Sequence, residues 1–286
     1  MEAFETYRRY LFSLAYRMLG SAMDAEDLVQ ETYLRYQAAK PETIHSLQAY
    51  LTTILTRLCL DHLQLAYRKR EVYVGPWLPE PILTEETPDA ADPEKRVEAQ
   101  ESIKLAFLVL LEQLQPFERA VFLLREVFAY EFAEIASMLE KSEAACRRSF
   151  SRAKQHLIDQ RPRFQPAPET HRQLLTSFQA AVESGDLTTL MQVLSENVIL
   201  WTDGGGKTRK ALLRPMSGRE VVARMTLASK RIWPQNARIE LREVNGQTAL
   251  VVRVDGRAWS CLSIEVEHGQ IQVIRIMVNP DKLTQV

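Results

Sequence analysis

Residues 131–160, EFAEIASMLEKSEAACRRSFSRAKQHLIDQ, decide the fold of the middle of the chain, because they predict two helices joined by a tight turn. In the first helix the apolar residues recur at the spacing of one buried helical face, namely Phe132, Ile135, Ala136 and Leu139. Ser142 then stands where a helix N-cap belongs, and Glu143 places negative charge in the first turn of the second helix. The stretch therefore predicts a helix-turn-helix.

The second of these helices has an apolar side and a basic side. Its apolar positions are Cys146, Phe150, Ala153 and Leu157. The residues that fall largely away from this stripe are Arg147, Arg148, Ser151, Arg152, Lys154 and Gln155. A helix of this kind fits the major groove of DNA, and these six are the candidate duplex contacts. A solvated surface helix has the same pattern, so this stretch alone does not choose between the two.

The length and composition fit a multidomain protein. The 286 residues suggest two or three domains, and an apolar fraction of 46 % is enough for ordinary cores. The net charge of −1 hides an acidic stretch at 80–101 and basic residues elsewhere, so a polyanion would meet patches. The three cysteines are widely spaced, which argues against disulfides or a thiolate metal site and favours a reducing cytosol.

The amino terminus and the hydropathy of the chain argue against secretion or membrane insertion. MEAFETYRRY lacks a basic segment followed by an apolar one, and no apolar run approaches about 18 residues. We therefore expect a soluble cytoplasmic protein with no membrane partner.

The first seventy residues predict a small helical domain. Helices are expected at 2–19, at 24–38 and from about 47 to 68, with a stop at Gly20 and a loop at 40–46 that contains Pro41. The second helix carries polar residues at Asp27, Gln30 and Glu31, and the third ends in the basic run 68–70.

Two segments of this domain resemble region 2 of bacterial sigma factors of the sigma-70 class. They are DAEDLVQETYLRY at 24–36 and AYLTTILTRLCLDHL at 49–63. The later helix-turn-helix resembles region 4, and the compact size resembles the extracytoplasmic-function (ECF) group. The resemblance implies that Asp27, Gln30 and Glu31 contact the clamp of core RNA polymerase.

The same resemblance places the 40–46 loop and the third helix at the melted −10 element of the promoter. Aromatic side chains suit this task because an unpaired base stacks on them, and basic side chains hold the phosphates. The candidate −10 contacts are Tyr50, Arg57 and Arg68.

Residues 71–101 are rich in proline, which prevents helix and favours extended chain. The segment 77–81, WLPEP, is too apolar for a simple spacer, so Trp77 is expected to pack on a neighbouring domain. YVGPWLPEP at 73–81 closely matches the linker of the SigJ-like ECF sigma factors, which carry an additional C-terminal SnoaL-like domain. In sigma factors this linker threads near the active centre of the polymerase.

The turn of the helix-turn-helix departs from the region 4 pattern, which usually has glycine where this chain has Glu140. A left-handed residue other than glycine costs about 1 kcal/mol. We expect either that strain at Glu140 or a slightly different turn. Residues 94–127 are expected to supply two more helices, the second starting at Pro116, that complete a four-helix unit.

After the proline-rich residues 161–168 the pattern becomes α+β. Helices are expected at 170–183, 187–194 and 218–230, and strands at 198–201, 237–244, 248–254, 258–267 and 271–278. The pairs at 245–246, 255–256 and 268–269 are strong hairpin signals. Helices followed by a curved antiparallel sheet resemble the SnoaL-like cone, which nuclear transport factors and ketosteroid isomerases also use.

Two short motifs mark candidate regulatory residues in this last domain. DGGGKT at 203–208 does not fit a phosphate loop, because the Walker pattern needs glycine where Trp201 stands. DGGGK and NPDKL, at 279–283, match instead the two signatures of the SigJ-like SnoaL domain, which implies a regulatory contact with the sigma core. The candidates are Trp77, Pro79, Asp203, Gly204, Gly205, Gly206, Lys207, Asn279, Pro280, Asp281, Lys282 and Leu283.

A catalytic cone would need an acid or base that projects into it. Glu183, Asp186, Asp203, Trp259 and His268 are available, but they form no pair or constellation that can be assigned. We therefore predict no catalytic residue, no metal site and no cofactor.

The sequence thus predicts two all-α domains followed by an α+β SnoaL-like cone. The expected boundaries are 1–72 for region 2, 73–100 for the linker, 101–163 for region 4 and 164–286 for the cone. The expected function is that of a non-enzymatic sigma factor with core RNA polymerase and promoter DNA as partners, modulated by contact between its C-terminal domain and the sigma core. Two alternatives stay open: a one-component regulator that binds DNA and an unknown cone ligand, and a cone-fold enzyme fused to a DNA-binding module.

Overall fold

The computed structural model describes residues 2–39, 44, 46–70, 73–84, 104–158 and 167–286. The chain divides into two compact units. The helical unit contains 1–72, 92–103 and 107–161, and the α+β unit contains 73–91, 104–106 and 162–286. The segment after residue 72 therefore belongs to the same unit as the C-terminal domain.

Three long helices begin the helical unit: α1 (Glu2–Leu19), α2 (Ala22–Ala39) and α3 (Leu47–Arg70). Gly20 ends α1 with a left-handed φ of 68°, and the Ser21 side chain accepts from the Asp24 N–H at 3.1 Å in the first turn of α2. Apolar residues of these helices form the core of this part of the unit, with Leu11, Leu14 and Leu51 fully enclosed. The predicted helices are confirmed, although most of the 40–46 loop lies outside the described residues.

The second half of this unit begins with α5 (Leu105–Leu111) and α6 (Pro116–Phe122). A single π-helical turn (Leu123–Val127) follows α6, where the pattern had predicted a plain helix. In this wider turn the N–H of Phe128 bonds to the carbonyl of Leu123, and Ala129 then takes a positive φ.

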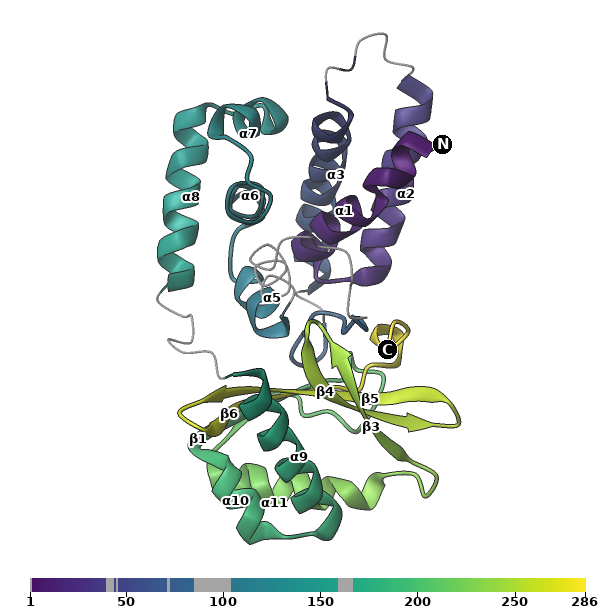
Figure 1. The fold of residues 1–286 in the computed structure, drawn as a ribbon, viewed down its shortest axis with the longest axis vertical. Helices are drawn as coiled ribbons and strands as arrows, with labels where there is room; N and C mark the ends of the chain where they lie inside the picture. The colour runs from purple at the N-terminus through teal and green to yellow at the C-terminus, as the bar shows by residue number, and fades with distance from the viewer. Residues whose placement is uncertain (1, 40–43, 45, 71–72, 85–103, 159–166) are drawn as a thin grey trace. The chain divides into compact units, whose positions relative to one another are not determined.

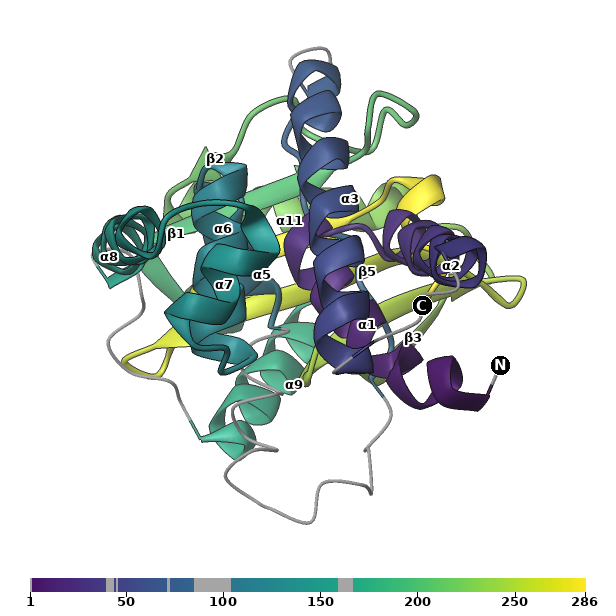
Figure 2. The same ribbon diagram turned by 90° about the horizontal axis from the view of Figure 1, so that it is seen from above.

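The predicted helix-turn-helix is present as α7 (Phe132–Leu139) and α8 (Glu143–Ile158). Glu140 adopts the left-handed conformation (φ 54°, ψ 46°), so the expected strain is located at this residue. Ser142 is the N-cap of α8, because its hydroxyl accepts from the Ala145 N–H at 3.2 Å. Helix α3 lies against both α6 and α7, as Figure 2 shows.

The α+β unit combines three helices with a six-stranded sheet. The helices are α9 (Pro168–Ser184), α10 (Leu187–Val193) and α11 (Arg219–Ser229), with a 3₁₀ turn at Lys230–Ile232. The strands are β1 (Leu194–Asp203), β2 (Met216–Ser217), β3 (Arg238–Val244), β4 (Gln247–Val254), β5 (Arg257–Glu267) and β6 (Gln270–Met277). The three helices cover one face of the sheet (Figure 1).

The sheet order is β2-β1-β6-β5-β4-β3, and β1 runs parallel to β6. The expectation of a wholly antiparallel sheet is therefore wrong. The three predicted hairpins are confirmed, since both residues of each turn have positive φ, as type I′ turns require. β1 and β6 are separated along the chain by β2, α11 and the strands β3 to β5, so no local turn signal marked their parallel pairing.

Candidate nucleic-acid interface and linker-binding site

Helix α8 separates its apolar and basic residues as the pattern predicted. Cys146, Ala153 and Leu157 are buried, and Phe150 stacks on Phe122 with ring centroids 6.0 Å apart. The six candidate DNA contacts are all exposed on the remaining surface of the helix: Arg147, Arg148, Ser151, Arg152, Lys154 and Gln155. The fold therefore presents them together to solvent.

Three of the basic residues on this surface already have acidic partners. Arg147 pairs with Glu143 on the same helix at 2.5 Å, Arg152 with Glu118 at 2.8 Å and Lys154 with Glu126 at 3.7 Å. Exposed pairs of this kind contribute at most about 1 kcal/mol, so a phosphate can replace the carboxylate. Arg148 makes no ion pair with any residue that the structure describes.

The candidate −10 contacts lie on α3. Tyr50 is half-buried beside Tyr36, with ring centroids 6.4 Å apart. Arg57 donates from Nε to the Met138 carbonyl at 2.9 Å and pairs with Glu140 at 2.9 Å. The side chain of Arg68 and residues 40–43 and 45 of the preceding loop lie outside the described residues.

Arg57 belongs to a wider contact between the first three helices and the later ones. The hydroxyl of Tyr130 lies 2.9 Å from that of Tyr10 and 3.0 Å from that of Thr52. Arg119 donates to the Met18 carbonyl at 2.6 Å. Burial raises the pKa of the Tyr10 phenol, which keeps it protonated. The helical unit is thus closed by buried polar contacts between its two halves.

The candidate polymerase contacts lie on α2. Asp27 and Gln30 are exposed, and Glu31 is partly exposed and pairs with Arg35 at 2.8 Å. Met23 is 53 % and Leu34 57 % exposed, and helical spacing puts both on the stripe of Asp27 and Gln30. The sequence pattern did not indicate that these two apolar residues are exposed, because buried apolar residues recur at the same helical spacing.

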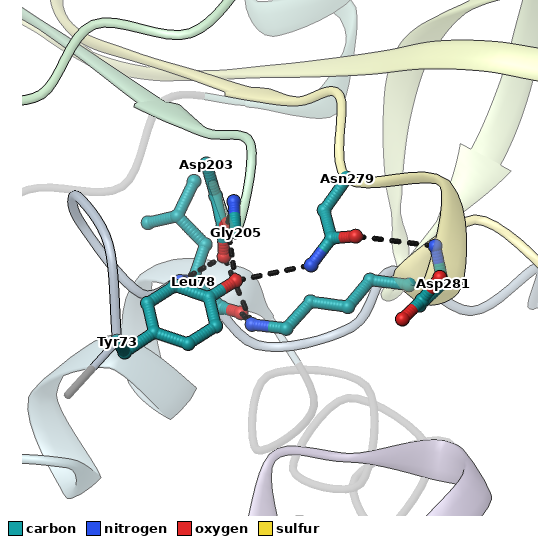
Figure 3. Close-up of polar contacts among 7 residues, drawn as sticks. Tyr73, Leu78, Asp203, Gly205, Asn279 and Asp281 are labelled. Atoms are coloured by element: carbon teal, nitrogen blue, oxygen red, sulfur yellow. Dashed lines mark hydrogen bonds and ion pairs between the residues drawn. The ribbon is translucent and has the colours of Figure 1, made fainter. Parts of the chain in front are cut away.

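The regulatory candidates gather around the buried carboxylate of Asp203, which is 0 % exposed at the end of β1 (Figure 3). Its Oδ1 accepts from the Tyr73 hydroxyl at 2.5 Å and from the Gly205 N–H at 3.1 Å. Its Oδ2 accepts from the Leu78 N–H at 2.8 Å and from the Lys282 ammonium at 2.9 Å. The carboxylate thereby joins the segment 73–78, its own loop and the C-terminus within one unit.

Lys282 is the cationic member of this cluster and is 7 % exposed. Besides Asp203, it donates to the Leu78 carbonyl at 2.7 Å, and its Nζ lies 4.0 Å from the centre of the Trp77 ring. Asn279 donates to the Tyr73 hydroxyl at 3.1 Å. Burial, together with the Asp203 carboxylate, raises the pKa of Tyr73. The buried charges are thus paired and hydrogen-bonded, as burial requires.

Close approach explains the glycines of the DGGGK motif. A Cβ on Gly204 would lie 2.5 Å from that of Ala211, and one on Gly205 would overlap the Asn279 amide and lie 3.0 Å from the Tyr73 hydroxyl. Gly205 and Gly206 also have positive φ. At the exposed edge Lys207 pairs with Asp281, while Leu283 is buried and Pro280 begins a 3₁₀ turn.

The linker has a second attachment further along. Pro79 is buried, and the Ile82 N–H and carbonyl bond to Asn245 in the β3–β4 turn at 3.2 and 2.9 Å. The Thr84 hydroxyl accepts from the Gly246 N–H at 2.9 Å. The sequence pattern predicted a hairpin turn at 245–246 and placed Tyr73 and Leu78 in a motif, but it did not indicate that these residues attach the linker.

The residues considered for catalysis do not converge on a site. Glu183, Asp186 and His268 are exposed, and Asp203 faces the linker segment. Of the five residues considered, Trp259 alone lines the cavity between the sheet and the helices. Within the described ranges there is also no group of three metal-ligating side chains, and none of the described helices is long and apolar enough to cross a membrane.

Two family models match the helical part of the chain. The model of sigma-70 region 2 matches residues 3–69, and that of sigma-70 region 4 matches residues 104–157. Two relatives come from Mycobacterium tuberculosis. The chain is 38 % identical to the ECF RNA polymerase sigma factor SigJ, covering 98 % of this chain and 92 % of that one. It is 32 % identical to the probable ECF RNA polymerase sigma factor SigI, covering 98 % and 93 %.

Solved structures extend this similarity to the whole fold. The crystal structure of M. tuberculosis SigJ matches with a TM-score of 0.77 and 35 % identity, covering 99 % of this chain and 98 % of that one. An NTF2-like protein from Burkholderia xenovorans, 18 % identical, covers 42 % of this chain and 96 % of its own, with a TM-score of 0.30.

Proposed function

Because the chain belongs to the ECF group of sigma-70 family sigma factors, we propose that its C-terminal α+β domain modulates its activity by holding the linker. The family membership means that the protein binds core RNA polymerase and promoter DNA and directs transcription initiation. It is a specificity subunit and not an enzyme. The proposal concerns how its own residues divide this work.

The single observation that carries the proposal is the fourfold hydrogen bonding of Asp203. The carboxylate fixes the backbone of Leu78 and the side chain of Tyr73, both in the linker, while Lys282 neutralises its charge. In a sigma factor this linker has to leave any resting position to thread through the polymerase. These contacts of Asp203 with Tyr73, Leu78 and Lys282, here called the Asp203 cluster, have to break before the linker is released. The free energy needed to break them therefore regulates transcription.

Polymerase docking is assigned to the exposed stripe of α2. Asp27 and Gln30 form its polar middle and Met23 and Leu34 its apolar ends, with Glu31 beside it. Protein interfaces combine apolar contacts with polar groups that form hydrogen bonds, and this stripe offers both. The stripe also lies opposite the residues of α2 that pack into the core, so docking leaves the helical unit folded.

Duplex reading at the −35 element is assigned to the exposed surface of α8. Arg148 makes no ion pair among the described residues, whereas Arg147, Arg152 and Lys154 make exposed ion pairs. Arg147 and Lys154 also lie over the rings of Phe132 and Phe150, and Arg152 donates to the Ser149 hydroxyl. On binding, phosphates replace these carboxylates at little cost. Ser151 and Gln155 add neutral hydrogen-bonding groups on the same surface.

Single-strand contacts at the −10 element are assigned to Tyr50, Arg57 and Arg68 on α3. The contacts of Arg57 support a closed resting form, because its hydrogen bonds end on Met138 and Glu140 beside the recognition helix. The −35 and −10 elements are about 25 base pairs apart by their names, which is about 85 Å of duplex. The two reading surfaces therefore have to separate before both can contact the promoter.

The one-component regulator is the weaker alternative. Such a regulator needs no polymerase-docking domain, whereas the region 2 model matches residues 3–69 of this chain. The two functions differ in one property, because only a sigma factor makes core polymerase initiate at a promoter by itself.

The test is reconstitution with purified core polymerase. The intact chain is expected to co-elute with core polymerase and to support run-off transcription from promoters selected out of genomic DNA. The double variant Asp27→Lys/Gln30→Lys is expected to lose co-elution, while Gln173→Lys, an exposed change on α9, leaves it intact. If the double variant bound core polymerase as the wild type does, the assignment of α2 would be wrong.

A further inference from the structure

The α+β unit contains a cavity of about 100 Å³ between its sheet and its helices. Side chains from α9, α11 and five strands line it, and most of them are apolar, including Phe178, Leu200, Met225, Leu250 and Trp259. It is therefore a small preformed apolar cavity, large enough for a molecule of a few carbon atoms. The function proposed above makes no use of it.

Six polar side chains interrupt the apolar lining, namely Gln179, Thr202, Lys210, Thr226, Ser229 and Ser260, and two of these bear on a ligand, Thr226 and Lys210. Thr226 on α11 is 7 % exposed, and its hydroxyl has no hydrogen-bond partner among the described residues. A buried hydroxyl without a partner is uncommon in folded proteins. Thr226 lines the cavity, and rotation of its side chain about χ1 can turn the hydroxyl toward an occupant that supplies the acceptor.

Lys210 is the second of these two residues, and its exposed side chain lies at the edge of the cavity. Its ammonium group is 4.0 Å from the centre of the Trp259 ring. Partial burial lowers the pKa of Lys210 without an ion pair to offset it among the described residues. A cation that is partly desolvated and rests on an aromatic face favours an anionic partner.

We propose that the cavity binds a small carboxylic acid with an apolar aliphatic or aromatic body. The body fills the apolar lining, and the oxygen atoms accept from Lys210 and Thr226. Both polar groups can donate hydrogen bonds, which selects an acceptor-rich head group over an amine. This binding does not require polymerase or DNA and is thus independent of the proposed function.

The cavity lies directly next to the Asp203 cluster along the chain. Thr202 and Val278 line the cavity, and the next residues, Asp203 and Asn279, hold the linker segment. A ligand therefore packs against the ends of β1 and β6 from which the linker is held. This gives a small molecule a physical connection to the linker.

Calorimetric titration of the full chain tests the proposal, with butyrate, hexanoate, octanoate and benzoate as probes and hexanol as the neutral comparison. At least one acid is expected to bind saturably at one site and more tightly than hexanol. Lys210→Met should weaken that acid about tenfold, the effect of losing a charge-assisted hydrogen bond. Thr226→Val, which keeps the shape, should weaken it severalfold, and Met225→Trp should abolish binding by filling the cavity.

The matched controls are Lys230→Met and Thr188→Val, which change exposed residues of the same unit outside the cavity lining. Both are expected to bind as the wild type, and circular dichroism checks that every variant is folded. The proposal is overturned if no acid binds the folded protein at millimolar concentration, or if Met225→Trp binds as well as the wild type. Equal affinities for hexanoate and hexanol, unaffected by Lys210→Met, would overturn the assigned ligand class.

Discussion

The carboxylate of Asp203 accepts hydrogen bonds from four groups that come from three parts of the chain, which makes this residue the centre of the linker-binding site. A buried carboxylate is tolerated only because it is paired and fully hydrogen-bonded. Each partner therefore depends on the others, and removal of the charge leaves the Lys282 ammonium buried without its counter-ion.

We expect Asp203→Asn to lower the free energy of unfolding of the α+β unit by about 3 kcal/mol, the cost of breaking a buried ion pair. Urea unfolding of the full chain measures this. The matched control is Asp281→Asn, since Asp281 pairs with Lys207 at the exposed edge and should cost less than about 1 kcal/mol. Equal effects of the two substitutions would contradict the central place of Asp203.

Gly205→Ala tests the close approach in the DGGGK loop. Gly205 and Gly256 both have positive φ, but only at Gly205 does an added Cβ meet other atoms. We expect Gly256→Ala to cost about 1 kcal/mol from the backbone alone and Gly205→Ala clearly more, because Asn279 and Tyr73 have to shift. Thermal unfolding compares the two, and equal losses would show that only the backbone conformation matters.

At the scale of the elements, α8 is a rigid support for the basic residues, and its apolar stripe fixes which residues face outward. If Arg148 contacts a phosphate, Arg148→Ala is expected to reduce the slope of log affinity for the promoter against log salt concentration by about one. If it contacts a base, it should cost about 1–3 kcal/mol and relax the sequence preference at one position. Holoenzyme binding at several salt concentrations separates these results.

The control for this experiment is Arg172→Ala, an exposed arginine of α9 outside the recognition helix. It should leave both the slope and the affinity unchanged. The assignment of α8 to DNA would be contradicted if Arg148→Ala behaved like Arg172→Ala.

The contact between the two halves of the helical unit is a second property of the elements. We expect Tyr130→Phe to weaken the closed form, because the Tyr130 hydroxyl is bonded to Tyr10 and Thr52. A lost hydrogen bond of about 1 kcal/mol shifts opening by about fivefold, so the affinity for core polymerase should rise severalfold. Binding titration with labelled core polymerase measures it, with Tyr7→Phe as the control. A fall in affinity would mean that this contact supports docking.

Much of the fold could be predicted from the sequence, because helices and hairpins are encoded locally. The stripe of α8, the Ser142 cap and the turns at 245–246, 255–256 and 268–269 all depend on neighbouring residues. The parallel pairing of β1 with β6 and the bond between Tyr73 and Asp203 join distant residues, so no periodicity indicates them. The motif resemblance singled out Asp203, whereas only the structure reveals its four partners.

At the scale of the whole molecule, the two units carry different parts of the proposed function. The helical unit carries the residues assigned to polymerase and promoter, and the α+β unit holds the linker segment through Asp203, Lys282 and Asn245. A domain that holds the linker can change how readily the sigma factor assembles with core polymerase. The central claim is therefore that release of the linker from the Asp203 cluster controls transcription.

Run-off transcription with sigma factor below saturation tests this claim most directly. The transcript yield from core polymerase with Asp203→Asn is compared with that from the wild type and from Asp281→Asn, and circular dichroism confirms that the helical unit is folded in each. We expect a severalfold higher yield with Asp203→Asn than with the wild type, because its linker is released more easily, and no change with Asp281→Asn. Equal yields from all three proteins would contradict it.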